Sequence, residues 1–335
     1  MADRGGVRQR QPARQRVESQ IDLSCCIRWR STGTVEYSSV QLTCTGSSIG
    51  KMLSYELVIV TGCMRSGTSL LYGLISTSPD VGPPLAAARY FADFVNLYRR
   101  YRGSDRPFAT DYFLPGEDMK LVMRQILTDR LDAAWTNSGK PACLVIRSVD
   151  FAPMIPLVAD LLPDAQFVVS ARDPKDTITS ILKVGRKQKL LGLTKTSPAI
   201  KRDISRLCKN YNGSYLPGLR AQREQPSLQE RLNFVRYEDA ARDPADALSG
   251  VWARLGMAPG SHDPETLSRR PSLRDLASHR YWRTYITDLH NGPASVESVG
   301  SHGLFLSEAE ARAIDRRCRH VRRVFGYTGV PAILG

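Results

Sequence analysis

The sequence predicts an α/β fold in which helices cover both faces of a parallel β-sheet. Two observations lead to this prediction: short apolar segments of strand length recur along the chain, and helical patterns separate them. Strands that are joined through helices pair in parallel and leave those helices on the faces of the sheet. A hydrophobic content of 42% over 335 residues is enough for one large core.

The first 51 residues differ in composition from the rest of the chain. They contain clustered arginines, stretches rich in Ser, Thr and Gly, and little helical periodicity. No aromatic side chains alternate with these charges, which favours a solvated tail over a nucleic-acid-binding arm. We therefore expect a basic, disordered extension over 1–51, a single domain over 52–335, and no nucleic-acid partner.

Four apolar segments are predicted to form the strands. They lie at 57–61, 142–146, 166–171 and 232–237. Between the strands, apolar residues at helical spacing predict a helix over 119–135 and another over 151–162.

Capping residues mark further helix starts. The Asp-Pro pairs at 173–174 and 243–244 each combine an N-cap with a proline at the first helical position. Near the C-terminus, Ser307 and Glu310 form a capping-box pattern, and Gly326 is expected to end that last helix.

A loop with a glycine at each end follows the first strand. The spacing of Gly62 and Gly67 is that of a P-loop, in which backbone N–H groups and a helix N-terminus bind phosphate. Thr68 and Ser69 stand where such loops have Lys and then Ser or Thr, so the lysine that contacts a nucleoside triphosphate is absent. Arg65 supplies a cation inside the loop instead. The loop therefore predicts a phosphate site for a ligand other than ATP or GTP.

Polar side chains also follow the other strands. Arg147 ends the second strand, Arg172 follows the third, and Tyr237 ends the fourth. Because parallel sheets bind ligands beyond the carboxyl ends of their strands, we expect these residues to lie near Arg65. The formal net charge of +14 suits an anionic ligand.

Two segments resemble the signatures of sulfotransferases that use 3′-phosphoadenosine 5′-phosphosulfate (PAPS). The segment 61–70, Thr-Gly-Cys-Met-Arg-Ser-Gly-Thr-Ser-Leu, resembles their phosphosulfate-binding loop, in the style of bacterial and tyrosylprotein sulfotransferases. The segment 167–174, Phe-Val-Val-Ser-Ala-Arg-Asp-Pro, followed by Ser180, resembles their second signature. Weaker matches at 235–239 and 306–327 extend the resemblance. It implies a sulfotransferase-like fold, a P-loop-containing parallel β-sheet flanked by helices.

The resemblance implies a role for each matching residue. The 5′ end of PAPS would be bound by Gly62, Arg65, Ser66, Gly67, Thr68 and Ser69. Arg172 and Ser180 would bind the 3′-phosphate, and Tyr237 would lie near the nucleotide. Arg65 and Arg147 would stabilise the charge on the departing nucleotide during in-line transfer. PAPS has no γ-phosphate, and the family needs no metal ion.

Two departures from the family concern proton transfer. Arg147 stands where relatives often have a catalytic lysine, and arginine neutralises charge but cannot act as a general acid. Relatives of the tyrosylprotein type have a glutamate after the first helix, where this chain has the alanines 86–88. The base is therefore not identified by resemblance. Candidates within reach in sequence are Asp93, Glu117 with its neighbour Asp118, and the more distant His302.

The sequence thus predicts a sulfotransferase that acts on a hydroxyl of a small molecule, a sugar or a peptide tyrosine. The acceptor pocket is expected among loops at 82–118 and 184–230, which carry no recognisable motif. A P-loop kinase or NTPase is one alternative, disfavoured by Thr68. A nucleotide-binding or nucleic-acid-binding protein without catalysis is another, favoured by the absent base.

Two further features bear on location. The seven cysteines are scattered, and the first residues lack the apolar segment of a secretory signal, which favours a cytoplasmic protein. No apolar run approaches the length of a membrane span, so we expect none.

Overall fold

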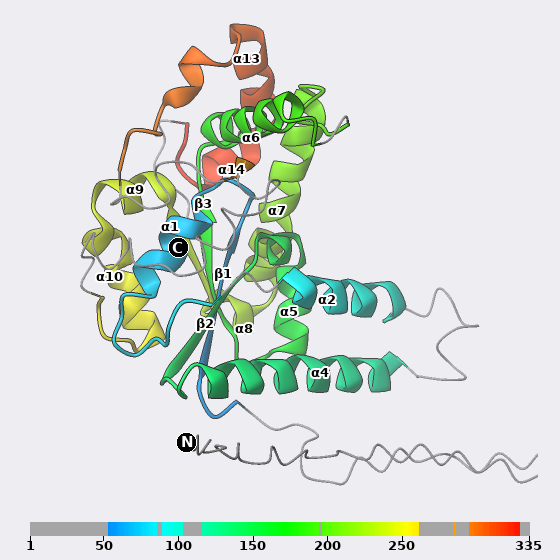
Figure 1. Cartoon of the computed structure of the whole chain (residues 1–335), viewed down its shortest axis with the longest axis vertical. Coiled ribbons are helices and arrows are strands. Elements are labelled where there is room, and N and C mark those ends of the chain that lie inside the picture. Colours follow the sequence, from blue (N-terminus) through cyan, green and yellow to red (C-terminus); the bar gives the residue numbers. More distant parts are fainter. Residues whose placement is uncertain are drawn as a thin grey trace, which may run out of the picture. The chain divides into compact units, whose positions relative to one another are not determined.

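The computed structural model describes residues 53–85, 89–102, 116–193, 196–260, 284–285 and 295–328, with the backbone alone at 89 and 116–117. The extension expected at 1–51 lies outside the described residues, so it and the single domain expected over 52–335 stay predictions. Within the described residues, strands and helices alternate along the chain (Figure 1).

Four strands form one parallel sheet in the order β2-β1-β3-β4 among the described residues. They are β1 (Glu56–Gly62), β2 (Cys143–Arg147), β3 (Gln166–Ala171) and β4 (Leu232–Arg236). Each agrees with its predicted range to within one residue at either end, and the predicted parallel sheet is confirmed. Because β1 lies between β2 and β3, the loop after β1 leaves the sheet at its centre.

Helices occupy the connections between the strands. Between β1 and β2 lie α1 (Thr68–Ile75), α2 (Arg89–Tyr101) and α4 (Gly116–Asn137). Between β2 and β3 lie the 3₁₀-helix η1 (Val149–Met154) and α5 (Ile155–Leu161). Between β3 and β4 lie α6 (Pro174–Leu190), α7 (Ile204–Glu224) and α8 (Pro226–Gln229). After β4 come α9 (Tyr237–Arg242), α10 (Pro244–Leu255), η4 (Ser301–Leu304), α13 (Glu308–Arg317) and α14 (Arg319–Val324).

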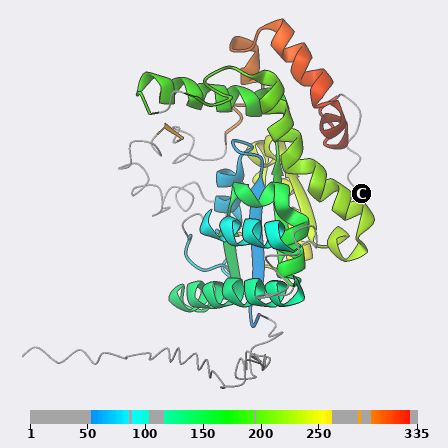
Figure 2. The ribbon, with the colours of Figure 1, turned by 90° about the vertical axis from the view of Figure 1, so that its right-hand side faces the viewer.

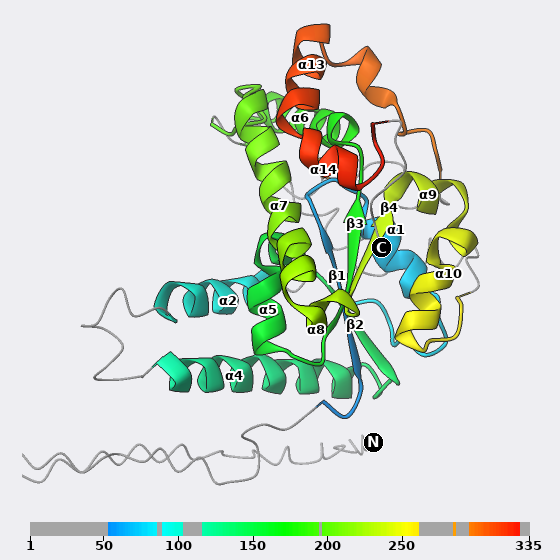
Figure 3. The same cartoon turned by 180° about the vertical axis from the view of Figure 1, so that it is seen from behind.

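Successive residues of β1 belong to different cores on the two faces of the sheet. Leu57 and Ile59 pack with side chains from α5 and α7, whereas Val58 and Val60 pack with side chains from α1 and α10. Figures 1 and 3 show α1 and α10 on one side of the sheet and α5 and α7 on the other. Burial on both faces explains why the strands are almost continuous apolar segments in the sequence.

The C-terminal helix predicted after Ser307 is two helices in the structure. Ser307 and Glu310 form the predicted capping box at the start of α13. The helix is interrupted at Cys318, which is completely buried, and continues as α14. Figure 2 shows α13 and α14 beside α7.

The expectation of loops over 184–230 is wrong. This range contains the end of α6, all of α7, and α8. The apolar face of α7 is present in the sequence as Leu207, Tyr211 and Tyr215 at helical spacing, but Pro217 and the nearby glycines obscure it.

Candidate nucleotide-binding site

The loop between β1 and α1 contains three residues with positive φ. They are Gly62 at 148°, Arg65 at 70° and Gly67 at 99°. A Cβ at Gly62 would lie 2.5 Å from the carbonyl oxygen of Ser170, and a Cβ at Gly67 would overlap the ring of Tyr237. Both glycines are therefore required by close contacts as well as by backbone conformation. Arg65 adopts a left-handed conformation that is unfavourable for a non-glycine residue, as is common at functional sites.

Arg172, at the end of β3, is held between the loop and two other segments. Its Nη1 donates a hydrogen bond to the carbonyl oxygen of Arg65 at 3.4 Å, and its Nη2 donates to that of Ser298 at 2.6 Å. Its guanidinium carbon lies 4.3 Å from the centroid of the Tyr237 ring. The Nε of Arg172 is buried and has no hydrogen-bond partner among the described residues.

The side chain of Arg65 reaches the same cluster. Its Nε donates to the Oγ of Ser180 at 3.1 Å, and its Nη1 donates to the carbonyl oxygen of Tyr285 at 2.8 Å. Burial and the nearby charge of Arg172 lower the pKa of Arg65 to about 10, so the guanidinium stays charged at neutral pH. No carboxylate among the described residues forms an ion pair with either arginine. Two like charges, one buried at Arg172 and one half-buried at Arg65, favour an anionic ligand in this arrangement.

Arg147 provides a cation on the opposite side of the loop. It is the last residue of β2, and its Nη1 donates to the Oγ of Ser69 in the first turn of α1 at 2.9 Å. Its guanidinium carbon lies 5.1 Å from the centroid of the Tyr72 ring, and burial lowers the pKa of Arg147. The end of β2 and the start of α1 are thereby joined beside the loop.

A buried carboxylate, Glu238, forms hydrogen bonds just beyond the end of β3. It accepts hydrogen bonds from the N–H of Asp173 at 3.0 Å and from the hydroxyl of Tyr327 at 2.7 Å. Burial raises the pKa of Glu238. The start of α6, the first turn of α9 and the chain after α14 therefore meet at this one side chain.

Asp176, in the first turn of α6, attaches the segment that follows residue 295. Its buried carboxylate accepts hydrogen bonds from the backbone N–H groups of Gly300 at 2.7 Å and His302 at 3.1 Å, and lies 2.8 Å from Nδ1 of His302. This attachment holds Ser298 against Arg172, and the Ser298 hydroxyl lies 2.7 Å from that of Tyr237.

The four candidate bases lie in different parts of the structure, and Asp118 is exposed on α4. His302 contacts Asp176, on the side of the site where Arg172 lies. Asp93 is exposed on α2, and the side chain of Glu117 lies outside the described residues, as do the alanines 86–88.

Asp150 is a carboxylate that the sequence reasoning missed. It is half-buried in η1, three residues after Arg147. Its N–H donates to the Oγ of Ser148, and the carbonyl oxygen of Ser148 accepts a hydrogen bond from the hydroxyl of Thr61 on β1 at 2.7 Å. The structure therefore places Asp150 at the same sheet edge as Arg147. An acidic residue soon after a strand end was the signal available in the sequence.

The described residues contain no cluster of metal ligands and no helix that could span a membrane. None of their His, Cys, Asp and Glu side chains form a group of three that could hold a metal ion. None of the helices in this part of the chain combines the length and the apolar character needed to cross a membrane.

Comparison with known proteins identifies the family. A sequence profile of the sulfotransferase family matches residues 58–259, which include most of β1, the loop, the other three strands and Arg172. The chain therefore belongs to the sulfotransferase family, and the family suggested by the two sequence signatures is confirmed. No curated protein sequence matches the chain.

The chain is also similar to solved sulfotransferase structures. The sulfotransferase domain of the Synechococcus PCC 7002 olefin synthase is 15% identical, with a TM-score of 0.52, and the match covers 84% of this chain and 97% of that one. At this identity the match shows the fold alone. The sulfotransferase domain from the curacin biosynthetic pathway is 16% identical, with a TM-score of 0.47 and coverages of 80% and 99%. Mouse sulfotransferase SULT7A1 complexed with PAP is 17% identical, with a TM-score of 0.46 and coverages of 83% and 89%.

Proposed function

We propose that this sulfotransferase takes the sulfuryl group from PAPS and transfers it to a hydroxyl acceptor. The observation that supports PAPS as the donor is the pair of guanidinium groups of the half-buried Arg65 and the buried Arg172, neither of which forms an ion pair with a carboxylate among the described residues. A nucleotide with phosphate groups at both its 3′ and 5′ positions supplies negative charge to each of them.

The two ends of the donor are assigned to different groups. The loop N–H groups, the start of α1 at Thr68, and Arg65 bind the 5′-phosphosulfate, because a glycine-bearing loop before a helix favours an anion there. Arg172, Ser180 and Tyr237 bind the 3′-phosphate. The unpartnered Nε of Arg172 supports this assignment, since a buried donor without an acceptor is costly.

In this proposal, catalysis relies mainly on stabilisation of the negative charge that develops on the departing nucleotide. The bond between sulfur and the bridging oxygen of the donor breaks while a bond forms between sulfur and the acceptor oxygen. Arg65 and Arg147 neutralise the negative charge that grows on the departing phosphate. Asp150 accepts the proton of the acceptor hydroxyl. A general base of this kind typically contributes about 10²–10⁴-fold to the rate.

A nucleotide-binding role without turnover is the second candidate. Two observations favour it: Asp93 is exposed, and His302 is engaged by Asp176. It shares the donor site with the first candidate and differs only in catalysis, so binding and turnover have to be measured separately.

Calorimetry with 3′,5′-adenosine bisphosphate (PAP) and with ATP plus Mg²⁺ tests the donor site. We expect tight binding of PAP and weak binding of ATP, because ATP lacks the 3′-phosphate. Tight binding of ATP alone would exclude PAPS as the donor. A subsequent screen of phenols, sugars and tyrosine peptides with labelled PAPS tests turnover, and the absence of turnover beside tight PAP binding would favour the second candidate.

A further inference from the structure

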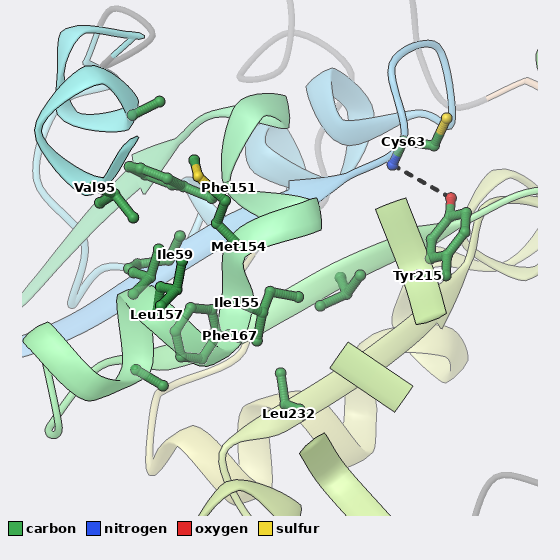
Figure 4. Packing of buried hydrophobic residues seen from close by; sticks show 14 of the residues in the cluster. Ile59, Cys63, Val95, Phe151, Met154, Ile155, Leu157, Phe167, Tyr215 and Leu232 are labelled. Carbon is green, nitrogen blue, oxygen red and sulfur yellow. Dashed lines mark hydrogen bonds between the residues drawn. The ribbon is translucent and has the colours of Figure 1, made fainter. Parts of the chain in front are cut away.

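Two tyrosines of α7 direct their hydroxyl groups at the candidate site from within the core. Tyr211 and Tyr215 are both completely buried, and their ring centroids lie 4.9 Å apart. The hydroxyl of Tyr211 donates to the carbonyl oxygen of Arg172 at 2.7 Å. The hydroxyl of Tyr215 donates to the carbonyl oxygen of Ser170 at 2.9 Å. It also accepts a hydrogen bond from the N–H of Cys63 at 3.4 Å (Figure 4).

Packing alone does not explain hydroxyl groups at these positions. A buried hydroxyl costs free energy unless it is hydrogen-bonded, and phenylalanine would fill nearly the same space. Burial raises the pKa of both tyrosines well above its usual value, so both phenols remain protonated donors. Each hydroxyl is bonded to the main chain of segments that carry the site.

The sheet itself does not fix the distance between the loop and Arg172. The pairing of β1 with β3 ends at Gly62 and Ser170, so Cys63 and Arg172 both lie beyond it. Among the described residues, the hydroxyl of Ser170 donates to the carbonyl oxygen of Ser66 at 2.7 Å and Arg172 donates to that of Arg65 at 3.4 Å, so the long bond is the one that involves Arg172 itself. Tyr211 and Tyr215 stand about 6 Å apart along α7. Tyr211 is bonded to Arg172, and Tyr215 is bonded to Cys63 of the loop and to Ser170 of β3.

We propose that Tyr211 and Tyr215 are positioning residues that fix the separation between the loop and Arg172 and so favour a nucleotide phosphorylated at both ends. The inference rests on the proposed donor. The two tyrosines affect the binding of different parts of this donor. Tyr211 holds Arg172 and so affects the 3′-phosphate alone, whereas Tyr215 holds Cys63 and Ser170 and so affects the 5′ end as well.

The test compares Tyr211→Phe and Tyr215→Phe with two nucleotides that differ only at the 3′ position. Affinities for PAP are measured by calorimetry, and those for adenosine 5′-phosphate by displacement of PAP. We expect Tyr211→Phe to weaken PAP about tenfold, as for one lost hydrogen bond, and to leave adenosine 5′-phosphate within about twofold. Tyr215→Phe should weaken both nucleotides.

Tyr98→Phe is the matched control. Tyr98 is also buried, and its hydroxyl donates to Asp160 at 2.7 Å, on α5 and away from the sheet edge that carries the site. It should change neither affinity. Placing 4-aminophenylalanine at position 211 restores a donor and should restore PAP affinity, which a general loss of packing would not allow.

An equal loss for both nucleotides in Tyr211→Phe, or no loss for PAP, would overturn the inference. Partial unfolding lowers the binding stoichiometry but leaves the ratio of the two dissociation constants unchanged. The ratio for PAP and adenosine 5′-phosphate therefore tests the inference even in a less stable variant. The proposed donor is judged separately, from the titration of the wild-type protein with PAP.

Discussion

The guanidinium of Arg172 donates a hydrogen bond to the carbonyl oxygen of Arg65, so the end of β3 meets the loop that follows β1. These residues are 107 positions apart in the chain. Both side chains are cations, and their proximity contributes to the lowered pKa of Arg65. The two guanidinium groups therefore form a positively charged cluster at this edge of the sheet.

Removing either cation should remove nucleotide binding. Each charge-assisted hydrogen bond contributes about 1.5–3 kcal/mol, so Arg65→Ala and Arg172→Ala should each weaken PAP by about 100-fold or more. Calorimetry measures the effect. Arg231→Ala is the control, because Arg231 donates to the carbonyl oxygen of Pro163 at the opposite edge of the sheet. Wild-type affinity in either site variant would refute its assigned role.

Gly67→Ala should destabilise the fold through two effects. The φ of 99° is unfavourable for alanine, and the added Cβ meets the ring of Tyr237. Together we expect a loss of about 2–5 kcal/mol in the free energy of unfolding. Gly139→Ala separates the effects, because Gly139 has a φ of 87° and no atom within 4 Å of its added Cβ. Urea unfolding should show a clearly smaller loss for Gly139→Ala, and equal losses would contradict the steric argument.

Ionisation of Glu238 should make stability depend on pH. Burial raises the pKa of Glu238 in the folded state. The folded state then binds the proton more tightly than the unfolded state, so this contribution is present below the unfolded pKa of about 4.3 and is lost as pH rises through the folded pKa. Glutamine cannot ionise. Urea unfolding should therefore show the stability of Glu238→Gln, relative to wild type, improving between pH 4 and pH 7, and a constant difference would contradict this assignment.

Asp150→Asn tests the proposed base. We expect kcat to fall about 10²–10⁴-fold while the affinity for PAP stays unchanged, because Asp150 is assigned to the acceptor proton and not to the nucleotide. Asp93→Asn, a change at an exposed position of α2, should leave kcat unchanged. The pair of variants is compared by initial rates with an acceptor found in the screen. An unchanged kcat in Asp150→Asn would remove it from the mechanism.

Local signals in the sequence predicted most of the sheet and several helix starts. β3 begins and ends at the predicted residues, and Asp173 caps α6 as expected, because both depend on neighbouring residues alone. Helix α7 was missed and its range was expected to be loop, because Pro217 lies within it. The strand order, with β1 at the centre, is a property of tertiary packing that no single segment encodes.

The sequence predicted that residues at the strand ends would lie near Arg65, but it did not predict the contacts that they make. Arg65, Arg172 and Tyr237 do lie together, since strand ends share one edge of a parallel sheet. Ser180 was expected to accompany Arg172, yet its hydroxyl accepts a hydrogen bond from Arg65. The binding of His302 to Asp176 joins residues 126 positions apart, and this long-range pairing has no local signal.

The hydrogen bond between Tyr327 and Glu238 also has a consequence for protein synthesis. Glu238 supports the N–H of Asp173, next to Arg172, but its partner Tyr327 is 89 residues further along the chain. A ribosome has therefore translated the loop, the sheet and Arg172 long before it adds Tyr327. The nascent chain carries every proposed donor-binding residue before Tyr327 is available to bond Glu238, so the site cannot reach its final form until Tyr327 has been added.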